Sequence, residues 1–368
     1  MKPIHLYNGC LRSGMGATLA EASAAYLDGR LPSAQWYDLR ELGEQRAYLA
    51  APASNLQLEA DLEALARECL ADEPGPFDDV LLVIASTTLD IGQMEARVAQ
   101  GEPFHNDLST SLDRLAAGLR DSLGLAGAFT MNTACTSAAN ALLYAGRLVA
   151  SGAYRRALVM AFETPCQLAM QGFGALGLLS PSGHYRPFHP QRDGLVLGEA
   201  YCAVMLGEQP GERPLARLLG GFSACDTSNL TTTLEDGSHI DWVMRQALDS
   251  ACVTSADIAL VKLHGTATGA NDIAESNGMQ RLFAGLQPPS CVLKPYLGHT
   301  LGACGLSETL LLLDALRQGP LPPVDYADEA MLALNGAPLA LPPEALLLSN
   351  FFGFGGNNAS LVLQGAQP

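Results

Sequence analysis

Short apolar runs of strand length alternate with helical stretches along most of this sequence. The runs at 79–86 (DVLLVIAS) and 157–162 (ALVMAF) have the length of buried strands and fall far below the roughly 20 apolar residues that a membrane helix needs. The alternation predicts an α/β protein with helices layered on mostly parallel or mixed sheets. Strands are expected near 3–8, 79–86, 127–131, 156–162, 214–222, 258–263, 345–350 and 359–364, and helices near 17–28, 57–71, 107–123, 135–151, 239–251, 271–283 and 303–317. The region 40–78 as a whole is expected to be helical surface.

The composition excludes several classes of protein. The chain has 368 residues, of which 48% are hydrophobic and 16% charged, so it is long and apolar enough to bury a large core. Its net charge of −17 argues against binding a nucleic-acid backbone, which requires clustered lysine and arginine. The opening residues MKPIHLYNGC contain no long apolar stretch and no cleavage site, so no signal peptide and a cytoplasmic location are expected.

The nine cysteines do not form a pattern of disulfides or metal ligands. Their number is odd and no CxxC spacing occurs, so neither a disulfide framework nor a zinc site is expected. Most of them are expected to be small buried residues without chemistry.

One cysteine stands out because of its neighbours. In MNTACTSAANALLYAGRLVASG (131–152) a strand ends, Cys135 follows, and a helix rich in small residues begins at once. The positive end of a helix dipole favours a thiolate, so we expect a lowered thiol pKa and a nucleophile suited to acyl transfer. A purely structural cysteine is the competing interpretation at this point.

Two histidines lie beside glycine-rich turns. His264 ends a predicted strand in VKLHGTATGANDIAESNGMQ (261–280), the position at which α/β sheets bind ligands. A histidine that merely satisfies local polar groups is the alternative there. His299 follows Gly298 in LKPYLGHTLGACGLSETLLLL (293–313), where glycines on both sides permit a close approach.

A glycine-rich turn near the C-terminus joins two predicted strands. The segment SNFFGFGGNNASLVL (349–363) contains Gly353, Phe354, Gly355 and Gly356, which we call the GFGG loop. Such a loop can present backbone N–H groups or move as a gate. A nucleotide-binding loop does not fit this segment, since a strand and not a helix follows it.

Taken in order, these segments resemble the β-ketoacyl synthases of the thiolase superfamily. The resemblance runs from about 125 to 365 and includes TACTSAANAL, the RPF…RDG…GE segment of 172–206, HGTATGAND, LKPYLGHTLGACGLSE and SNFFGFGGNNASL. It implies a thiolase-like five-layer α-β-α-β-α fold with two similar halves. The halves would be residues 1–208, with the nucleophile, and 209–368, with both histidines and the GFGG loop, divided near the surface stretch GEQPGERP (207–214).

The resemblance also implies a mechanism. Cys135 matches the cysteine that takes an acyl group from an acyl carrier protein. His264 and His299 match the histidines that hold a malonyl thioester during its decarboxylation. Lys294 and Glu308 match supporting residues. The N–H groups of Cys135 and Phe354 would form the oxyanion hole, and Phe354, flanked by Gly353, Gly355 and Gly356, would be the gate.

The expected partners follow from the same resemblance. They are acyl carrier proteins bearing acyl and malonyl groups, together with a second identical chain or a related ketosynthase subunit, and no cofactor or metal. Arg147, Arg155 and Arg156 could supply a basic patch for an acidic carrier, although scattered solvated arginines are an equally good interpretation.

Some positions depart from the family pattern, and other functions compete. Pro295, Asn357, His189 and Cys304 replace residues that are common in the family, and the region before Cys135 is short. A non-catalytic chain-length-factor-like subunit is the main alternative, but such subunits typically lack the nucleophile. A thiolase or a synthase primed by coenzyme A is disfavoured because His299 occurs with Lys294 upstream.

Overall fold

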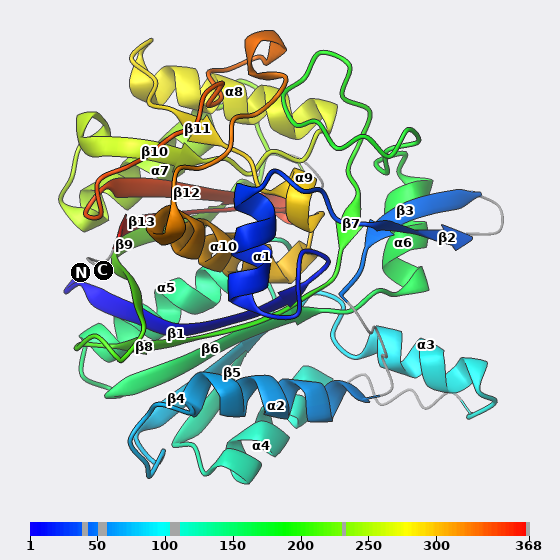
Figure 1. Ribbon diagram of the computed structural model, residues 1–368, viewed down its shortest axis with the longest axis vertical. Coiled ribbons are helices and arrows are strands. Elements are labelled where there is room, and N and C mark those ends of the chain that lie inside the picture. Colours follow the sequence, from blue (N-terminus) through cyan, green and yellow to red (C-terminus); the bar gives the residue numbers. More distant parts are fainter. Residues whose placement is uncertain (39–42, 51–56, 104–110, 230–232, 366–368) are drawn as a thin grey trace.

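Two five-stranded sheets face each other across two central helices in the computed structural model, which describes residues 1–38, 43–50, 57–103, 111–229 and 233–365 (Figure 1). The sheet of the N-terminal half has the order β1 (Ile4–Ser13), β8 (Ala200–Gly207), β6 (Arg156–Glu163), β4 (Val80–Ala85) and β5 (Gly127–Met131). The sheet of the C-terminal half has the order β9 (Pro214–Cys225), β13 (Asn357–Gly365), β12 (Leu346–Phe352), β10 (Ile258–Lys262) and β11 (Ser290–Cys291). Pairing of β1 with β9 joins them into one ten-stranded sheet.

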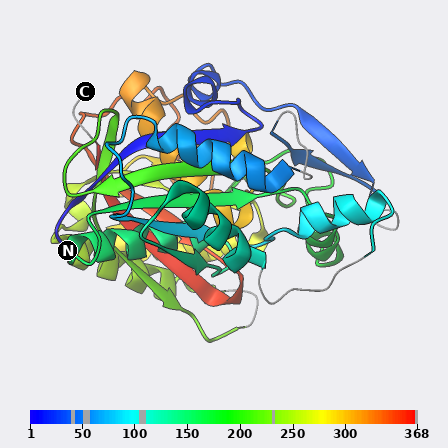
Figure 2. The same ribbon diagram turned by 90° about the horizontal axis from the view of Figure 1, so that it is seen from below.

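Further helices cover the outer face of each sheet. Helices α2 (Leu58–Leu70) and α4 (Ser111–Leu123) pack on the N-terminal sheet and lie in front of it when the molecule is seen from below (Figure 2). Helix α7 (Ser238–Ala251) packs on β9 and β13, with α8 (Gly269–Phe283) beside it. With α5 (Ser137–Ala150) and α10 (Cys304–Gln318) in the centre, the layers are α-β-α-β-α, which confirms the expected fold class.

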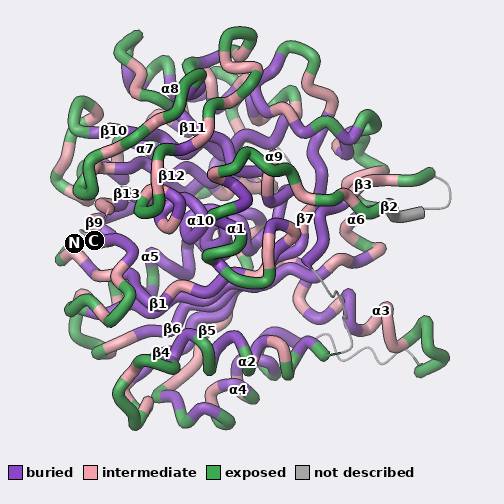
Figure 3. Tube along the Cα trace, in the orientation of Figure 1, coloured by how far each residue is buried: buried purple, intermediate pink, exposed green. Residues whose placement is uncertain are grey.

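The central helices are buried because their side chains are small or aliphatic on nearly every face (Figure 3). In α10 every residue from Cys304 to Leu313 is buried. The two helices cross so closely that a Cβ on Gly305 would overlap the Ala139 backbone nitrogen, so glycine is required at this crossing. This contact sets α10, and the loop before it, against the start of α5.

A smaller part of the chain projects beside the sheets, to the right in Figure 1. It contains the three-stranded sheet of β2 (Ala34–Asp38), β3 (Glu44–Tyr48) and β7 (Leu197–Gly198), and helices α3 (Ile91–Ala99) and α6 (Gln167–Ala175). The short helices α1 (Leu19–Leu27) and α9 (Lys294–Leu297) complete the structure, and α1 packs against α10.

The expected elements are largely confirmed, but several others were not expected: β2, β7, β11, α3, α6 and α9. Residues 40–78 were expected to be helical. This prediction is wrong for β3 and is confirmed for α2. Residues 39–42 and 51–56 lie outside the described part of the chain. Strand β8 was not expected, although its all-buried run AYCAVMLG has the composition of an interior strand. Of the helix expected at 107–123, the first four residues are outside the described part of the chain.

The connection from β8 to β9 crosses between the two sheets. Strand β8 ends at Gly207 and β9 begins at Pro214, with exposed residues between them. We therefore propose 1–208 and 209–368 as the two halves. Among the described residues, no helix has both the length and the apolar character needed to cross a lipid bilayer.

Candidate active site

Cys135 occupies a strained turn between β5 and α5. The residue before it, Ala134, has a φ of +52°, which is unfavourable for any residue with a Cβ. The Ser137 hydroxyl holds this turn, because it accepts from the Thr133 N–H at 2.8 Å and donates to the Ala134 carbonyl at 2.6 Å. The thiol is 5% exposed and faces the cavity described below.

The electrostatics of Cys135 differ from the sequence-based expectation. Burial raises the pKa of the thiol to about 11, and the Glu163 carboxylate also raises it. The positive charge of Lys294 and the backbone N–H groups of Phe354 and Cys135 act in the opposite direction. A lowered pKa was therefore the wrong expectation, since desolvation outweighs these favourable groups. The backbone N–H groups of Cys135 and Phe354 thus lie close to the sulfur, where the oxyanion hole was expected from the sequence.

Both predicted histidines are buried and offer the same ring nitrogen to the site. The His264 Nδ1 lies 3.2 Å from the Lys294 ammonium, which has only protons to give, so His264 carries its own proton on Nε2. The His299 Nδ1 accepts from the Leu301 N–H at 3.2 Å, which assigns the same tautomer to His299. The two rings meet edge to face, with centroids 5.5 Å apart.

The His264 Nε2 is buried and has no hydrogen-bond partner among the described residues. Burial, followed by the charge of Lys294, holds the pKa of both imidazoles well below the ordinary value. Both rings are therefore neutral at physiological pH, and each presents an N–H donor.

Lys294 and Glu308, the two predicted supporting residues, form an ion pair without solvent contact. The Lys294 Nζ lies 2.6 Å from Glu308 Oε1, and both side chains are at most 1% exposed. Burial disfavours the charged form of Lys294, but its neighbours, above all Glu308, raise its pKa overall. The structure thus links Glu308 to Lys294 and Lys294 to His264 in one chain of contacts.

Cys135, His264, His299 and the GFGG loop surround one cavity of about 240 Å³, which we call the active-site cavity. Its remaining walls are mostly apolar, as a cavity for an acyl chain would be. They are formed by Phe173, Leu176, Leu178, Leu195, Thr233, Thr266, Thr268, Gly269, Ala270, Asn271, Phe352 and Asn358. The structure therefore brings together the three residues that the sequence suggested as catalytic.

The GFGG loop closes one side of this cavity. The Phe354 ring is half-buried and stacks on Phe173, with centroids 5.4 Å apart and planes 23° apart. Gly355 has a φ of +77° and open space around its Cα, whereas a Cβ on Gly356 would overlap the Asp226 carbonyl oxygen. Gly356 is thus required by packing and Gly355 by backbone conformation. A Cβ on Gly353 would lie 3.1 Å from the Cys135 nitrogen, so this glycine lets the loop approach the nucleophile.

Two buried carboxylates that support the site were missed in the sequence. Glu163, at the end of β6, accepts from the backbone N–H groups of Thr87, Thr88 and Gly302 and from the Thr88 hydroxyl. Glu275 accepts from the backbone N–H of His264 at 2.7 Å, and burial raises its pKa to about 7. Glu275 lies three residues after the HGTATGAND motif, but Glu163 has no signal beyond its place at the end of an apolar run.

The four departures from the family pattern have ordinary structural roles. Cys304 donates its thiol proton to the Cys135 carbonyl at 3.0 Å, and Pro295 lies in the first turn of α9. Asn357 begins β13, and its carbonyl accepts from the Gly353 N–H at 2.7 Å. His189 lies 3.3 Å from a Glu329 carboxylate oxygen.

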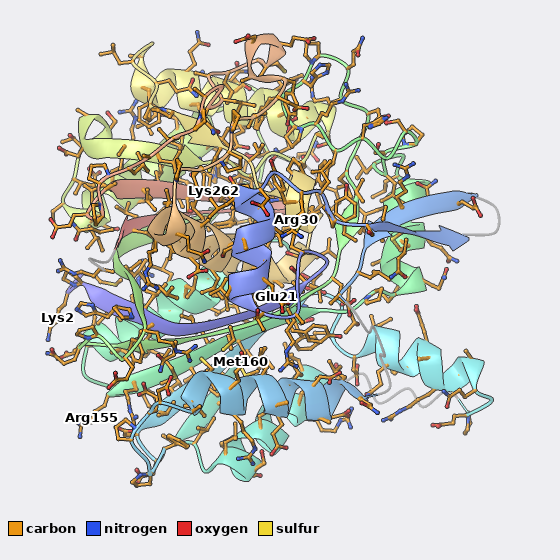
Figure 4. All side chains as sticks on the ribbon, viewed as in Figure 1. Lys2, Glu21, Arg30, Arg155, Met160 and Lys262 are labelled. Atoms are coloured by element: carbon orange, nitrogen blue, oxygen red, sulfur yellow. The ribbon has the colours of Figure 1, made fainter. Side chains whose placement is uncertain are left out.

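The arginines considered as a basic patch lie away from the cavity. Arg156 begins β6, whereas Glu163, next to Cys135, ends that strand, a separation of about 23 Å at strand rise. Arg156 is bound to Glu73 and Asp79, and Arg155 points outward at the lower left of Figure 4. Arg147 donates to the Gly221 carbonyl. These residues do not form a docking patch at the active-site cavity.

Comparisons with known proteins identify the family. The β-ketoacyl synthase N-terminal domain matches residues 34–210, and the β-ketoacyl synthase C-terminal domain matches residues 215–326. The chain belongs to the β-ketoacyl synthase family. Its relatives include 3-oxoacyl-[acyl-carrier-protein] synthase 2 of Vibrio cholerae, 32% identical over 70% of this chain and 67% of that protein. The same-named protein of Rhizobium meliloti is 33% identical over 63% of this chain and 59% of that protein.

Solved structures of ketosynthases share the fold over nearly the whole chain. The complex of a ketosynthase with its chain length factor from Xenorhabdus doucetiae matches with a TM-score of 0.83 and 25% identity, over 99% of this chain and 98% of that chain. A β-ketoacyl synthase from Burkholderia phymatum matches with a TM-score of 0.82 and 24% identity, over 100% of both chains. The expected thiolase-like architecture of this β-ketoacyl synthase is thereby confirmed.

Proposed function

We propose that this β-ketoacyl synthase catalyses decarboxylative condensation of an acyl group with malonyl-acyl carrier protein. The observation that carries the proposal is the convergence of one thiol and two neutral imidazole N–H donors on a single apolar cavity. A thiol supplies the nucleophile for acyl transfer, and two aimed donors stabilise an enolate oxygen.

Acyl loading is the first step. The Cys135 sulfur gives up its proton and attacks the thioester carbonyl of an acyl carrier protein. The N–H groups of Cys135 and Phe354 lie close to this sulfur and stabilise the oxyanion that forms beside it. The carrier's thiolate then leaves and takes up a proton, and the acyl group remains on Cys135 within the apolar walls of the cavity.

Condensation follows when the malonyl arm enters. His264 and His299 donate from Nε2 to the thioester oxygen of the malonyl group. The bond to the carboxylate carbon breaks, carbon dioxide leaves, and the electron pair forms an enolate that these donors stabilise. The enolate carbon attacks the acyl carbonyl on Cys135, the Cys135 thiolate departs, and the product is a β-ketoacyl thioester on the carrier.

The partners are proposed from the chemistry of the site and from the relatives' names. Relatives are named as synthases acting on the acyl carrier protein. Leu176 is 60% exposed and lies on the rim of the cavity, so carrier docking there is apolar in part. Strand β5 ends the sheet among the described residues and exposes 52% of Phe129, an edge at which a second identical chain or a related subunit can pair.

Nine free cysteines, of which seven are buried, fit a reducing compartment, and we propose a cytoplasmic location.

The alternative is a chain-length-factor-like subunit that assists another synthase. The neighbour from Xenorhabdus doucetiae is described as a ketosynthase with its chain length factor. A subunit without catalysis has no need of a thiol, two histidines of matching tautomer and the ion pair behind them. All of these are present around the active-site cavity.

Mass spectrometry of the purified protein tests the function. After incubation with a panel of acyl-carrier proteins, we expect one acyl group on Cys135 and none on a Cys135→Ala variant. Addition of malonyl-carrier protein should then release the acyl group as a product lengthened by two carbons. Absence of both acylation and malonyl decarboxylation, alone and with a related synthase subunit, would reject the proposal.

A further inference from the structure

A second lysine, Lys262, is buried beside the ion pair of the active site. It ends strand β10, and its side chain has no solvent exposure (Figure 4). Its ammonium group lies 2.7 Å from Glu308 Oε2, 2.6 Å from the Asn350 carbonyl and 3.5 Å from the centre of the Phe351 ring. Burial lowers the pKa of Lys262 overall, and the charge of Lys294 acts in the same direction. The contacts oppose this effect and favour the charged form, since a carboxylate, a carbonyl and an aromatic face all attract a cation.

Glu308 is therefore shared between two lysines. Its Oε2 accepts from Lys262 and its Oε1 from Lys294, with both distances at 2.7 Å or less. Two ammonium groups and one carboxylate leave one positive charge in a region without solvent. The Lys294 ammonium donates one hydrogen bond to Glu308 and another to the Nδ1 of His264.

We propose that Lys262 is a positioning residue for condensation: it occupies one oxygen of Glu308, so that Lys294 donates to the Nδ1 of His264 and retains an uncancelled positive charge behind that ring. The inference rests on the proposed function, because condensation is the reaction that needs His264 as an Nε2–H donor. Without Lys262, both oxygens of Glu308 would be free to accept from Lys294, which would neutralise its charge and draw it away from His264.

The net positive charge of the cluster formed by Lys262, Glu308 and Lys294 has two consequences for the active site. Lys262 and Lys294 both disfavour the protonated form of His264 and of His299, which keeps these rings neutral. The charge of Lys294 also favours the Cys135 thiolate. Loss of Lys262 should therefore make Cys135 less reactive although the two side chains do not touch.

Other titratable groups around Lys262 define the conditions for a test. Burial raises the pKa of the Cys291 thiol to about 12 and raises that of Cys304 further, so both remain neutral below pH 10. Glu275 has a pKa of about 7 and is ionised above pH 8. Because burial also lowers the pKa of Lys262, the test is made at pH 8.5, close to the lowest pH at which Glu275 is ionised. At this pH the charges that a variant would change are those of Lys262, Glu308 and Lys294.

The experiment compares alkylation rates of Cys135 by iodoacetamide at pH 8.5, read by peptide mass spectrometry. The exposed Cys252 in the same molecule is the internal reference. Lys262→Met keeps the length of the side chain and removes its charge, and the rate at Cys135 should fall about tenfold, as for a rise of one pKa unit. The double variant Lys262→Met with Glu308→Gln restores one net positive charge, and its rate should return to within about threefold of wild type.

A packing control separates charge from structure. Phe351→Leu removes the ring beneath Lys262 without changing any charge, so its alkylation rate should match wild type even where its melting temperature falls. A Lys262→Met rate equal to wild type, or a double variant as slow as the single one, would overturn the proposal. If Lys262→Met does not fold, the double variant, in which Glu308 no longer carries a negative charge, is compared with wild type, and a rate below the range of about threefold overturns the proposal.

Malonyl decarboxylation relative to acyl loading gives a second reading, and we expect this ratio to fall in Lys262→Met. A wild-type protein that neither loads nor decarboxylates would reject the proposed function, while the alkylation rates would still decide the role of Lys262.

Discussion

The ammonium group of Lys294 lies 3.2 Å from the Nδ1 of His264, and this contact determines which face of the imidazole is a donor. An ammonium cannot accept a hydrogen bond, so the proton of the neutral ring is on Nε2, on the side of the cavity. Glu308 Oε1 accepts a hydrogen bond from the Lys294 Nζ at 2.6 Å. In the proposed reaction, Lys294 and Glu308 would act through the tautomer of His264.

Replacement of either histidine should separate condensation from loading. We expect His264→Ala and His299→Ala to lower malonyl decarboxylation by at least about 10², the usual effect of removing one oxyanion donor. Loading of Cys135 should persist, because the backbone N–H groups of Cys135 and Phe354 remain. Stopped assays of carbon dioxide release and of acyl-enzyme formation measure the two steps. An equal loss of both would mean that the histidines mainly activate the thiol.

The rate of malonyl decarboxylation should not show the inflection near pH 6.5 that a histidine with an ordinary pKa would give. The pKa of both rings is held well below 6.5 by burial and by Lys294, so the neutral donors are fully formed at and above pH 6.5. Protonation would occur only as pH falls through those lower values. Malonyl decarboxylation, measured between pH 6 and 8, should therefore show no inflection centred on 6.5. A decline by half at that pH would show that the rings titrate normally.

Alkylation of Cys135 should follow a different pH profile. Because burial raises its thiol pKa to about 11, the thiolate fraction and the alkylation rate should still be increasing at pH 10. Lys294→Met removes the nearby positive charge, so it should lower the rate further at any given pH. A rate that reaches a plateau below pH 8 would show that the thiol is activated in the free protein.

Substitutions in the GFGG loop should change the rate of condensation, and the ratio of hydrolysis to condensation, more than they change the stability of the fold. Gly355 has a φ of +77°, so Gly355→Val should cost about 1–2 kcal/mol and slow condensation strongly by stiffening the loop. Phe354→Ala removes the ring that stacks on Phe173, and hydrolysis of the acyl-enzyme should rise relative to condensation.

The melting temperature of the same two variants is the control for the loop. A lower melting temperature with an unchanged ratio of hydrolysis to condensation would make Phe354 a packing residue only. Gly356 is unsuitable for this comparison, because a Cβ there would overlap the Asp226 backbone.

Much of the layered fold could be predicted from periodicity alone. Runs such as that of β4 are continuous and apolar, and their length favours an interior strand over a helix. The structure confirms that β4 is buried along its whole length. Strand β3 could not be predicted in this way, because EQRAY lacks an apolar pattern and pairs with β2 and with β7, which lies some 150 residues later. Pairing over such a distance is set by tertiary contacts that no local window contains.

The site was predicted in its residue types and mispredicted in its electrostatics. Cys135, His264 and His299 follow from short motifs, since glycines and strand ends mark where side chains can meet. The raised pKa of Cys135 comes from burial, which only the folded chain creates and which no local motif contains. Lys262 was overlooked for a similar reason. Its partner Glu308 is 46 residues away, and only the fold shows that one carboxylate is shared by two lysines.

The central claim is that Cys135 carries the acyl group that the malonyl unit extends. The most direct measurement is the intact mass of the wild-type protein and of Cys135→Ala, first with acyl-carrier protein and then with malonyl-carrier protein added. We predict a single acyl adduct on the wild type, located on Cys135 and lost upon malonyl addition as a β-ketoacyl product, and no adduct on the variant. An adduct of equal yield on Cys135→Ala would contradict this claim.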